Sequence, residues 1–554
     1  MRILCFLVFI SSFISIESKG QQLLDKHTEV FSKQDSLRGS ITKERAWWDL
    51  KQYRLDIKVN SLDSTITGSN TIKYKVLQEY NVMQIDLQNP LEISKIIQDG
   101  LELKYRREGN VYFVDLISQQ KTGAIKELTV FYGGKPKVAV SPPWDGGITW
   151  QKDQNGKPFI ASSCQGIGAS IWWPNKDHMY DEVDDMYISV NVPSDLMDVS
   201  NGRLLSVKKQ KDGTKTYNWY VSNPINNYGV NINIGDYVSF SEKYKGEKGI
   251  LNCSYYVLRN DLAKAKKQFK EVPRMLKAFE YWFGPYPFYK DGYKLVEVPY
   301  LGMEHQSSVT YGNGFQNGYL GHDMSGTGWG LKFDFIIVHE SGHEWFANNI
   351  TYKDIADMWI HESFTNYSES LFVEYYYGKK AGAEYVIGTR RDIRNDIPII
   401  GYYNVNNKGS GDMYPKGGNM LHTLRQIVND DTKWRSILRG LNATFYHQTV
   451  TTKQIEDYLS EQAGMDLNPF FNQYLRDIRI PILEYYFEKN QFVYRWANCV
   501  SGFNIPIKIS INGEEKWIQP QTSWKNESNI EENSKLMVDP NFYIAAKAIT
   551  NKID

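Results

Sequence analysis

The spacing of hydrophobic residues changes twice along this chain, and this limits the folds that the chain can adopt. From about residue 47 to 244, short segments alternate apolar and polar residues, as in 53–59 and 71–76. This two-residue period is typical of half-buried antiparallel strands. Near Asp261 the spacing becomes helical and stays so to about residue 479. Strand-like alternation returns in 483–487 and 507–511.

This order of segments predicts an α+β protein with several domains. At 554 residues the chain is long enough for roughly two to four domains, each with its own core. We predict an all-β N-terminal domain over 46–246, a helix-rich domain over 247–480 and a small C-terminal β domain over 481–554. The polar segment 21–45 is expected to be a loosely ordered lead-in.

The N-terminal residues have the pattern of a secretory signal peptide. Arg2 precedes an apolar run from Ile3 to Ile16, and a cut after Gly20 would follow small residues. We therefore expect residues 1–20 to be a signal peptide and the protein to be exported, either periplasmic or secreted. The alternative is an N-terminal helix packed in the core. No later run approaches the roughly 20 apolar residues that a transmembrane helix needs.

Charge and cysteine content exclude two further classes of protein. Lys plus Arg and Asp plus Glu both total 64, so the formal net charge is zero. Proteins that bind polyanions normally have a net or clustered basic excess, so we expect no nucleic-acid partner. Three cysteines remain after residue 20, too few for a disulfide framework. The sequence does not indicate the oligomeric state.

Two histidines four residues apart give the first sign of chemistry. His339 and His343 enclose Glu340 in the run His-Glu-Ser-Gly-His, which has apolar residues on both sides. Residues four apart share one face of a helix, so both imidazoles can bind one metal ion. Glu340 is then placed to act as a general base on water. The alternative is a helix with two structural histidines.

A carboxylate downstream completes the predicted metal site. Glu362 follows His343 after eighteen residues. Two histidines and one carboxylate leave a fourth position for water, as in a catalytic zinc site. We therefore predict one zinc ion per chain, bound by His339, His343 and Glu362. Glu369 lies two helical turns after Glu362 and is a candidate hydrogen-bond partner of a ligand, unless it is a solvated surface carboxylate.

The chain resembles the aminopeptidase N family, the gluzincin aminopeptidases of peptidase family M1. The zinc motif is similar to the family's, as are the segments 345–348 and 357–364 beside it. Four further segments are similar to other motifs of the family: 164–177, 283–287, 301–305 and 413–417. The resemblance covers most of residues 50–480 in family order. It implies that 247–480 is a thermolysin-like catalytic domain.

The resemblance also implies how the amino end of a substrate is bound. Glu304 is expected to bind the free α-amino group of a peptide. Backbone groups at Gly302 and Met303 are expected to align the peptide. Gln165 is expected to line the amino end, the alternative being an ordinary polar group at a strand edge.

Other residues are implied to act on the scissile bond or to support the metal. Tyr414 is expected to polarise the scissile carbonyl. Because the interval from Glu362 is short for the family, Tyr402 and Tyr403 remain alternatives. Asp357, in the segment before Glu362, is predicted to support the zinc site together with Glu369.

Three residues depart from the family pattern close to the predicted site. His305 replaces the usual Asn after Glu304, and His361 replaces the usual Asn before the ligand glutamate. Glu344 stands where the family commonly has Gln. None of these changes removes a ligand or the base, but each lies close enough to alter pKa values and substrate preference.

The motifs together predict a zinc-dependent aminopeptidase that hydrolyses the N-terminal residue from peptides with a free N-terminus. One alternative is a gluzincin endopeptidase without a strict N-terminal requirement. A second is a non-catalytic peptide-binding protein that keeps the fold. The second alternative predicts a damaged set of zinc ligands, and all the ligand residues are present.

Overall fold

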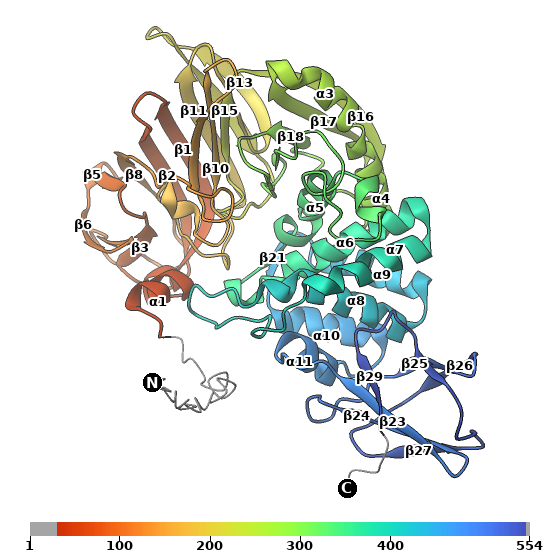
Figure 1. Cartoon of the computed structure of the whole chain (residues 1–554). Coiled ribbons are helices and arrows are strands. Elements are labelled where there is room, and N and C mark those ends of the chain that lie inside the picture. The colour runs from red at the N-terminus through yellow and green to blue at the C-terminus, as the bar shows by residue number, and fades with distance from the viewer. Residues whose placement is uncertain (1–29, 550–554) are drawn as a thin grey trace, which may run out of the picture.

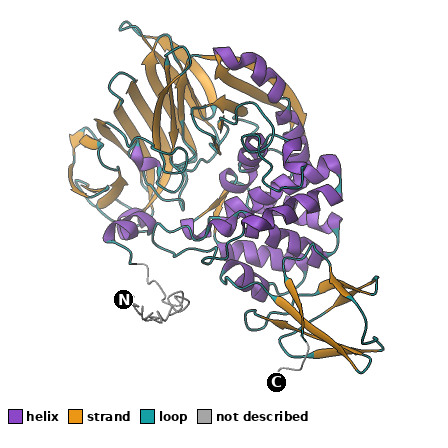
Figure 2. Cartoon of the chain, viewed as in Figure 1, coloured by secondary structure: helices purple, strands orange, loops and turns teal. Residues whose placement is uncertain are grey.

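A computed structural model describes residues 30–549 of the protein (Figure 1). A strand-rich N-terminal part, a helical middle part and a small strand-rich C-terminal part follow one another along the chain (Figure 2). This confirms the α+β architecture predicted from the changes in hydrophobic period. The predicted signal peptide lies outside the described residues. Within residues 30–549, no helix has the length and apolar character needed to cross a membrane.

The largest sheet of the N-terminal part has eight strands. Alternate side chains of β1, among them Tyr53, Leu55 and Ile57, are buried, as the two-residue period predicts. β1 pairs parallel with β11, and the other neighbours pair antiparallel. The order is β13 (Arg203–Lys209), β14 (Thr214–Val221), β11 (Asp185–Pro193), β1 (Trp48–Asn60), β2 (Thr65–Val76), β8 (Ile125–Gly134), β4 (Glu92–Gln98), β5 (Leu101–Glu102).

Two smaller sheets complete the N-terminal part. One has the order β3 (Val82–Asp86), β7 (Val111–Asp115), β6 (Lys104–Glu108). The other has the order β12 (Met197–Ser200), β15 (Ile232–Gly235), β10 (Pro158–Ser163), β9 (Gly147–Lys152). The three sheets share one hydrophobic core, which is separate from the core of the helical part.

Of the segment 21–45, which we expected to be a loosely ordered lead-in, the described residues 30–45 are instead folded onto the N-terminal part. It forms helices α1 (Lys33–Gly39) and α2 (Lys43–Ala46). The Arg45 side chain is fully buried, and its guanidinium lies 2.7 Å from a carboxylate oxygen of Asp86 on β3. The expectation failed because the partner of this charged residue comes from a distant strand, which local composition does not reveal.

A five-stranded sheet connects the N-terminal part to the helices. Its order is β16 (Tyr237–Gly246), β17 (Gly249–Leu258), β18 (Tyr293–Glu297), β20 (Val309–Tyr311), β19 (Gly302–Met303). The boundary that we predicted after residue 246 falls in the turn of the β16–β17 hairpin, so one sheet continues across it. β19 pairs only with β20 and forms an edge of the sheet beside the predicted site.

The helical part packs around α6, and its core is rich in aromatic residues. A short parallel pair of strands, β21 (Ile350–Tyr352) and β22 (Gln448–Val450), joins its two halves. The helices are α3 (Leu262–Gln268), α4 (Glu271–Phe283), α5 (Phe335–Gly342), α6 (Trp359–Tyr377), α7 (Lys379–Gly388), α8 (Pro415–Val428), α9 (Asp431–Thr444), α10 (Thr452–Ala463) and α11 (Asn468–Leu475).

The C-terminal part consists of two small sheets. One has the order β27 (Lys525–Ser528), β24 (Gln491–Ala497), β23 (Ile482–Glu488), β29 (Ala545–Ala548). The other has the order β26 (Glu514–Ile518), β25 (Ile507–Ile511), β28 (Leu536–Val538). Their buried side chains, including Leu483 and Trp496, continue the core of the helical part.

Candidate metal centre and active site

Helix α5 presents the two predicted histidine ligands on one face. Its N-cap residue Asp334 accepts a hydrogen bond from the Ile337 N–H at 3.3 Å. His339 lies in the last turn, and His343 follows the helix with helical backbone angles. The centroids of the two imidazole rings are therefore only 5.0 Å apart. The rest of the helix is almost completely buried, which fixes both rings in place.

Glu362 reaches the two histidines from the first turn of α6, which packs against α5 (Figure 1). Its Oε2 atom lies 3.8 Å from His339 Nε2 and 3.4 Å from His343 Nε2. Two ligands of a tetrahedral zinc ion, each about 2.1 Å from the metal, lie about 3.4 Å apart. This oxygen is buried and has no hydrogen-bond partner within residues 30–549. The three side chains therefore fit one zinc ion.

Hydrogen bonds at the far side of each imidazole orient the predicted ligands. His339 Nδ1 lies 2.7 Å from Glu369 Oε1, and Tyr385 donates its hydroxyl proton to Glu369 Oε2 at 2.7 Å. His343 Nδ1 lies 3.0 Å from the Phe346 carbonyl oxygen. Protons on both Nδ1 atoms leave the two Nε2 lone pairs free for a metal. Glu369 is thus buried at the site and is not a surface carboxylate.

The charges of His343 and Glu362 are strongly coupled in the metal-free protein. Burial disfavours the charge on each side chain, but their mutual attraction outweighs it. The pKa of His343 is raised to about 10, and the pKa of Glu362 is lowered to about 2. A metal ion that binds His343 must therefore displace a proton, so metal affinity should rise with pH.

Glu340 and Glu304 both face the predicted metal position. A carboxylate oxygen of each lies within 4.8 Å of the other and of a ring nitrogen of His343. Burial raises the pKa of both carboxyl groups, and that of Glu340 reaches about 7. A carboxyl group with a pKa near the working pH is well suited to exchange protons with water.

Gln165 and the β19 edge border the same space. The Gln165 side-chain amide donates to Glu304 Oε1 at 2.5 Å and to Glu362 Oε1 at 3.0 Å. It follows β10, so the N-terminal part contributes directly to the site. A Cβ atom at Gly302 would lie 2.6 Å from a methyl carbon of Ile336 and 3.2 Å from Glu340 Cγ, so a side chain there would displace the predicted base. Met303 lines the cavity next to it.

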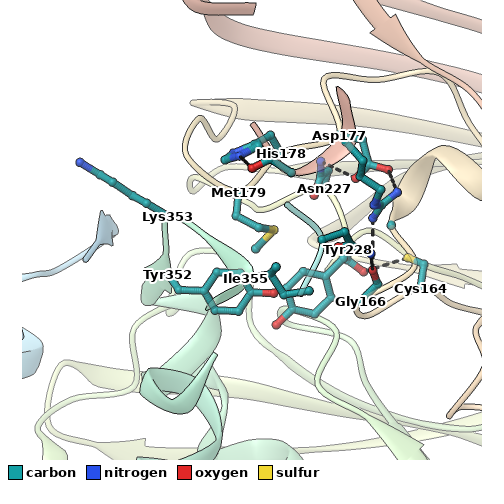
Figure 3. Close-up of a pocket in the computed structure, with 14 residues that line it drawn as sticks. Cys164, Gly166, Asp177, His178, Met179, Asn227, Tyr228, Tyr352, Lys353 and Ile355 are labelled. Carbon is teal, nitrogen blue, oxygen red and sulfur yellow. Dashed lines mark hydrogen bonds and ion pairs between the residues drawn. The ribbon is translucent and has the colours of Figure 1, made fainter. Parts of the chain in front are cut away.

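Tyr228 is a residue of this site that the sequence did not reveal. Its buried hydroxyl donates to Glu304 Oε1 at 3.1 Å. The Tyr352 N–H donates to His361 Nε2 at 3.0 Å. The imidazole of His361 therefore carries its proton on Nδ1. This Nδ1 atom lies 3.5 Å from the Tyr228 hydroxyl oxygen. His361, a departure from the family pattern, therefore supports Tyr228. Figure 3 shows the Tyr228 ring between Cys164, whose thiol donates to the Tyr228 carbonyl oxygen, and Tyr352.

Tyr414 is the only one of the three candidate tyrosines that lines the cavity. Its ring stacks on His339 with centroids 6.1 Å apart. Burial and the nearby charges of Glu362 and Glu304 raise the pKa of Tyr414 well above its usual value, so the hydroxyl keeps its proton and can donate it. Tyr402 and Tyr403 are 56% and 47% exposed.

Asp357 does not contact the predicted ligands. Its carboxylate accepts hydrogen bonds from the Thr452 N–H, the Thr452 hydroxyl and the Tyr403 hydroxyl, at 3.1, 2.6 and 2.6 Å. It therefore fixes the start of α10 beside the start of α6. We had predicted that Asp357 supports the zinc site, and these contacts differ from that prediction. The sequence pattern placed it close to Glu362 along the chain but could not give the direction of its side chain.

The two remaining departures from the family pattern add no charge at the predicted metal position. Burial lowers the pKa of His305 to about 3, so this imidazole is neutral. Glu344 accepts a hydrogen bond from the Ser307 N–H at 2.7 Å, and burial raises its pKa to about 8. Both side chains are fully buried and are absent from the cavity lining.

A cavity of about 640 Å³ lies in front of these groups. This volume is within the range of small-molecule and peptide sites. One part of its lining is polar and consists of Gln165, Glu304, His339, Glu340, His343, Glu362, Glu369 and Tyr414. A second part is apolar and consists of Leu301, Met303, Tyr319, Met324, Phe335 and Ile336.

Comparison with known proteins agrees with this geometry. Residues 268–474 match the model of the peptidase family M1 domain. The chain carries a peptidase family M1 domain. This confirms the resemblance that the motifs suggested, and the matched segment contains the five residues placed around the predicted metal position: Glu304, His339, Glu340, His343 and Glu362.

Relatives of this chain include archaeal and animal proteins. It is 21% identical over 463 residues to "Probable aminopeptidase 1" of Sulfurisphaera tokodaii, covering 77% of this chain and 54% of the relative. It is 22% identical over 440 residues to leukotriene A-4 hydrolase of Xenopus laevis, covering 74% and 68%. The chain spans about half the length of the archaeal aminopeptidases that it matches.

A solved structure shares the fold. The M1 zinc metallopeptidase of Deinococcus radiodurans superposes with a TM-score of 0.67 at 20% identity, covering 79% of this chain and 95% of that chain. A variant of that protein has been solved with a Tyr-Ser-Ala substrate. The likeness supports the architecture of a β-rich N-terminal part joined to a helical M1 domain.

Proposed function

We propose that this protein is a zinc-dependent aminopeptidase that removes the N-terminal residue from peptides. The observation that carries the proposal is the position of Glu304 within 4.8 Å of both Glu340 and His343. A carboxylate that can hold a substrate ammonium is thereby next to a base and a predicted metal ligand. The names of the relatives, which include aminopeptidases, support the same activity.

His339, His343 and Glu362 would hold the zinc ion, one per chain. A zinc ion bound there supplies Lewis-acid chemistry, since it acidifies water and polarises a carbonyl group. Glu340 takes a proton from the attacking water and delivers it to the departing amine. The Tyr414 hydroxyl donates a hydrogen bond to the carbonyl oxygen of the scissile bond as negative charge develops there.

The restriction to chain ends comes from the groups around Glu304. Its carboxylate is buried and pairs with the ammonium group of a peptide. A peptide bound through an internal bond supplies no ammonium group and would leave the buried Glu304 carboxylate without a partner, which is unfavourable. Gln165 and Tyr228 hold the Glu304 carboxylate in position, and the free edge of β19 aligns the substrate backbone.

The test is turnover of aminoacyl chromogenic amides before chelation, after chelation and after zinc readdition. We expect activity to disappear and return, and N-acetylated substrates to be inert. The variant Glu340→Gln should keep zinc and lose nearly all turnover, because its amide cannot accept a proton. Equal cleavage of free and acetylated substrates would favour an endopeptidase, and a zinc-loaded protein without turnover would favour a non-catalytic binding protein.

We also propose that the protein is exported, on the basis of the signal-peptide pattern in residues 1–20. N-terminal sequencing of the protein from cell fractions tests this proposal. A mature N-terminus near residue 21 in the exported fraction is the expected result. An intact N-terminus in the cytoplasmic fraction would contradict it.

A further inference from the structure

The charged groups of the active-site cavity are separated by depth. The carboxylates of Glu304, Glu340 and Glu362 are only 2%, 8% and 1% exposed and form its buried end. Two cationic side chains, Arg394 and Lys408, also line the cavity, and both are exposed to solvent. The cavity is therefore acidic at its buried end and basic at its exposed rim.

Neither of the two rim cations forms an ion pair with a carboxylate of the described chain. Within residues 30–549, neither the Arg394 guanidinium nor the Lys408 ammonium lies within 4.0 Å of a carboxylate oxygen. The one acidic residue beside them in the lining, Asp392, faces Arg391 at 3.9 Å. Within residues 30–549, both rim cations are thus without an ion-pair partner. Asp396 interacts with the charge of Arg394, but its carboxylate accepts a hydrogen bond from the Ser410 hydroxyl at 2.5 Å.

The backbone at both positions is held by hydrogen bonds. The N–H groups of Arg394 and Asn395 donate to the two carboxylate oxygens of Asp412, at 2.9 and 2.6 Å. Asp412 is buried and precedes Tyr414 by two residues. The rim segment that carries Arg394 is thereby tied to the segment that carries Tyr414.

The segment around Lys408 is anchored on both sides of the cavity. The Asn406 side-chain amide donates to the Gly166 carbonyl oxygen of the N-terminal part at 3.2 Å. The Ser410 N–H donates to the Pro398 carbonyl oxygen at 3.0 Å. Gly409 has a positive φ of 73°, and a Cβ atom there would lie 2.1 Å from the Ile399 carbonyl oxygen, so the turn beside Lys408 requires glycine.

A peptide bound for aminopeptidase cleavage enters this cavity amino end first. Its ammonium group pairs with Glu304 at the buried end, so the residues after the scissile bond extend toward the rim. Arg and Lys are the side chains that bind carboxylates, and the Arg fork can hold both oxygens of one carboxylate. The cavity therefore matches a substrate with a positive charge at its inner end and a negative charge at its outer end.

We propose that Arg394 and Lys408 bind the C-terminal carboxylate of short peptides, so that the enzyme selects short peptides with both ends free. This inference rests on the proposed aminopeptidase function. A carboxylate at the rim could also come from an acidic side chain after the scissile bond. The experiment below distinguishes these two sources.

The test compares kcat/KM for Ala-Ala-Ala with that for Ala-Ala-Ala-amide, in the zinc-loaded full-length protein. We expect the free acid to be preferred by about five- to tenfold, the size of one or two exposed charge pairs. The preference should shrink in 0.5 M salt, because the rim is exposed and its charges are screened. It should also shrink as the peptide is lengthened, because the carboxylate then lies beyond the rim.

Variants assign the preference to the two side chains. In Arg394→Gln and Lys408→Gln, the acid-to-amide ratio of kcat/KM should fall, and in the double variant it should approach one. Because the ratio compares two substrates of the same protein, a general loss of activity or stability cancels. Lys380→Met, which removes an exposed cation of α7 outside the cavity, is the matched control and should keep the wild-type ratio.

Three outcomes overturn the inference. The first is an acid-to-amide ratio near one in the wild-type protein. The second is an unchanged ratio in the double variant. The third is a preference found only for Ala-Glu-Ala-amide over Ala-Gln-Ala-amide, which would assign the rim to an acidic side chain. Turnover of alanine p-nitroanilide, which has no carboxylate, reports separately on the proposed function.

Discussion

The hydroxyl of Tyr228 should contribute strongly to the binding of a substrate amino group. In Tyr228→Phe, Glu304 loses a hydrogen bond of 3.1 Å in a site where both residues are buried. A hydrogen bond to a charged group contributes about 1.5–3 kcal/mol. Because Gln165 still donates to the same oxygen, we expect the lower half of this range. This corresponds to a decrease in kcat/KM of about 10- to 40-fold for peptides with a free amino group.

The assay is steady-state kinetics on an aminoacyl amide, with the zinc content of each variant measured in parallel. The effect should lie mainly in KM, with zinc content unchanged, because Tyr228 touches Glu304 and no predicted metal ligand. Tyr352→Phe is the matched control. It keeps a ring that stacks on His361 and removes a hydroxyl that has no hydrogen-bond partner among the described residues.

Two results would refute this reasoning. One is wild-type kcat/KM in Tyr228→Phe, and the other is an equal loss in the control variant. A double-mutant test adds a third measurement. If Tyr228 acts through Glu304, then Tyr228→Phe should change kcat/KM by less than about twofold when Glu304 is already replaced by Gln.

Three further predictions concern the metal and the stability of the fold. Glu369→Ala should weaken zinc binding by about 10- to 100-fold in a chelator competition, because His339 loses the acceptor that orients it; unchanged affinity would contradict that role. Burial lowers the pKa of His178 to about 3, whereas an imidazole in the unfolded chain titrates near 6.5. Below pH 6.5 the unfolded state therefore binds more protons than the folded state. The free energy of unfolding should fall by about 2 kcal/mol between pH 7.5 and pH 5. The same denaturation series on His178→Gln should show a weaker pH dependence, and identical curves would exclude this cause. Arg45→Met should lower the free energy of unfolding by about 3–5 kcal/mol, because Asp86 is left charged and buried, and Arg45→Met with Asp86→Asn should recover part of the loss.

The sequence predicted which side chains lie together in the candidate metal centre because this information is local. Helical spacing puts His339 and His343 on one face, and Glu362 and Glu369 share one face of the next long helix. The pattern also gave the order of strand-rich and helical parts. These features depend on residues near one another in the sequence, whose geometry follows from the period of the helix or strand.

The parts that sequence could not predict depend on contacts between distant segments. Tyr228 and Tyr385 reach Glu304 and Glu369 from other elements, and no spacing rule connects them. The same is true of Arg45, whose burial depends on Asp86, and of Asp357, which lies near Glu362 in sequence but bonds to Thr452. The direction of a side chain was the missing information in each case.

Gln165 makes the candidate site depend on how the N-terminal part sits against the helical part. This residue belongs to the β-rich N-terminal part, yet its amide joins Glu304 to Glu362 in the helical part. The predicted zinc ligands and Glu340 are carried by segments that pack in one hydrophobic core, whereas the groups proposed to bind chain ends come from both sides of the junction of two cores. A displacement of a few ångströms between the two cores would therefore separate Gln165 from Glu304 and Glu362 without moving the predicted zinc ligands apart.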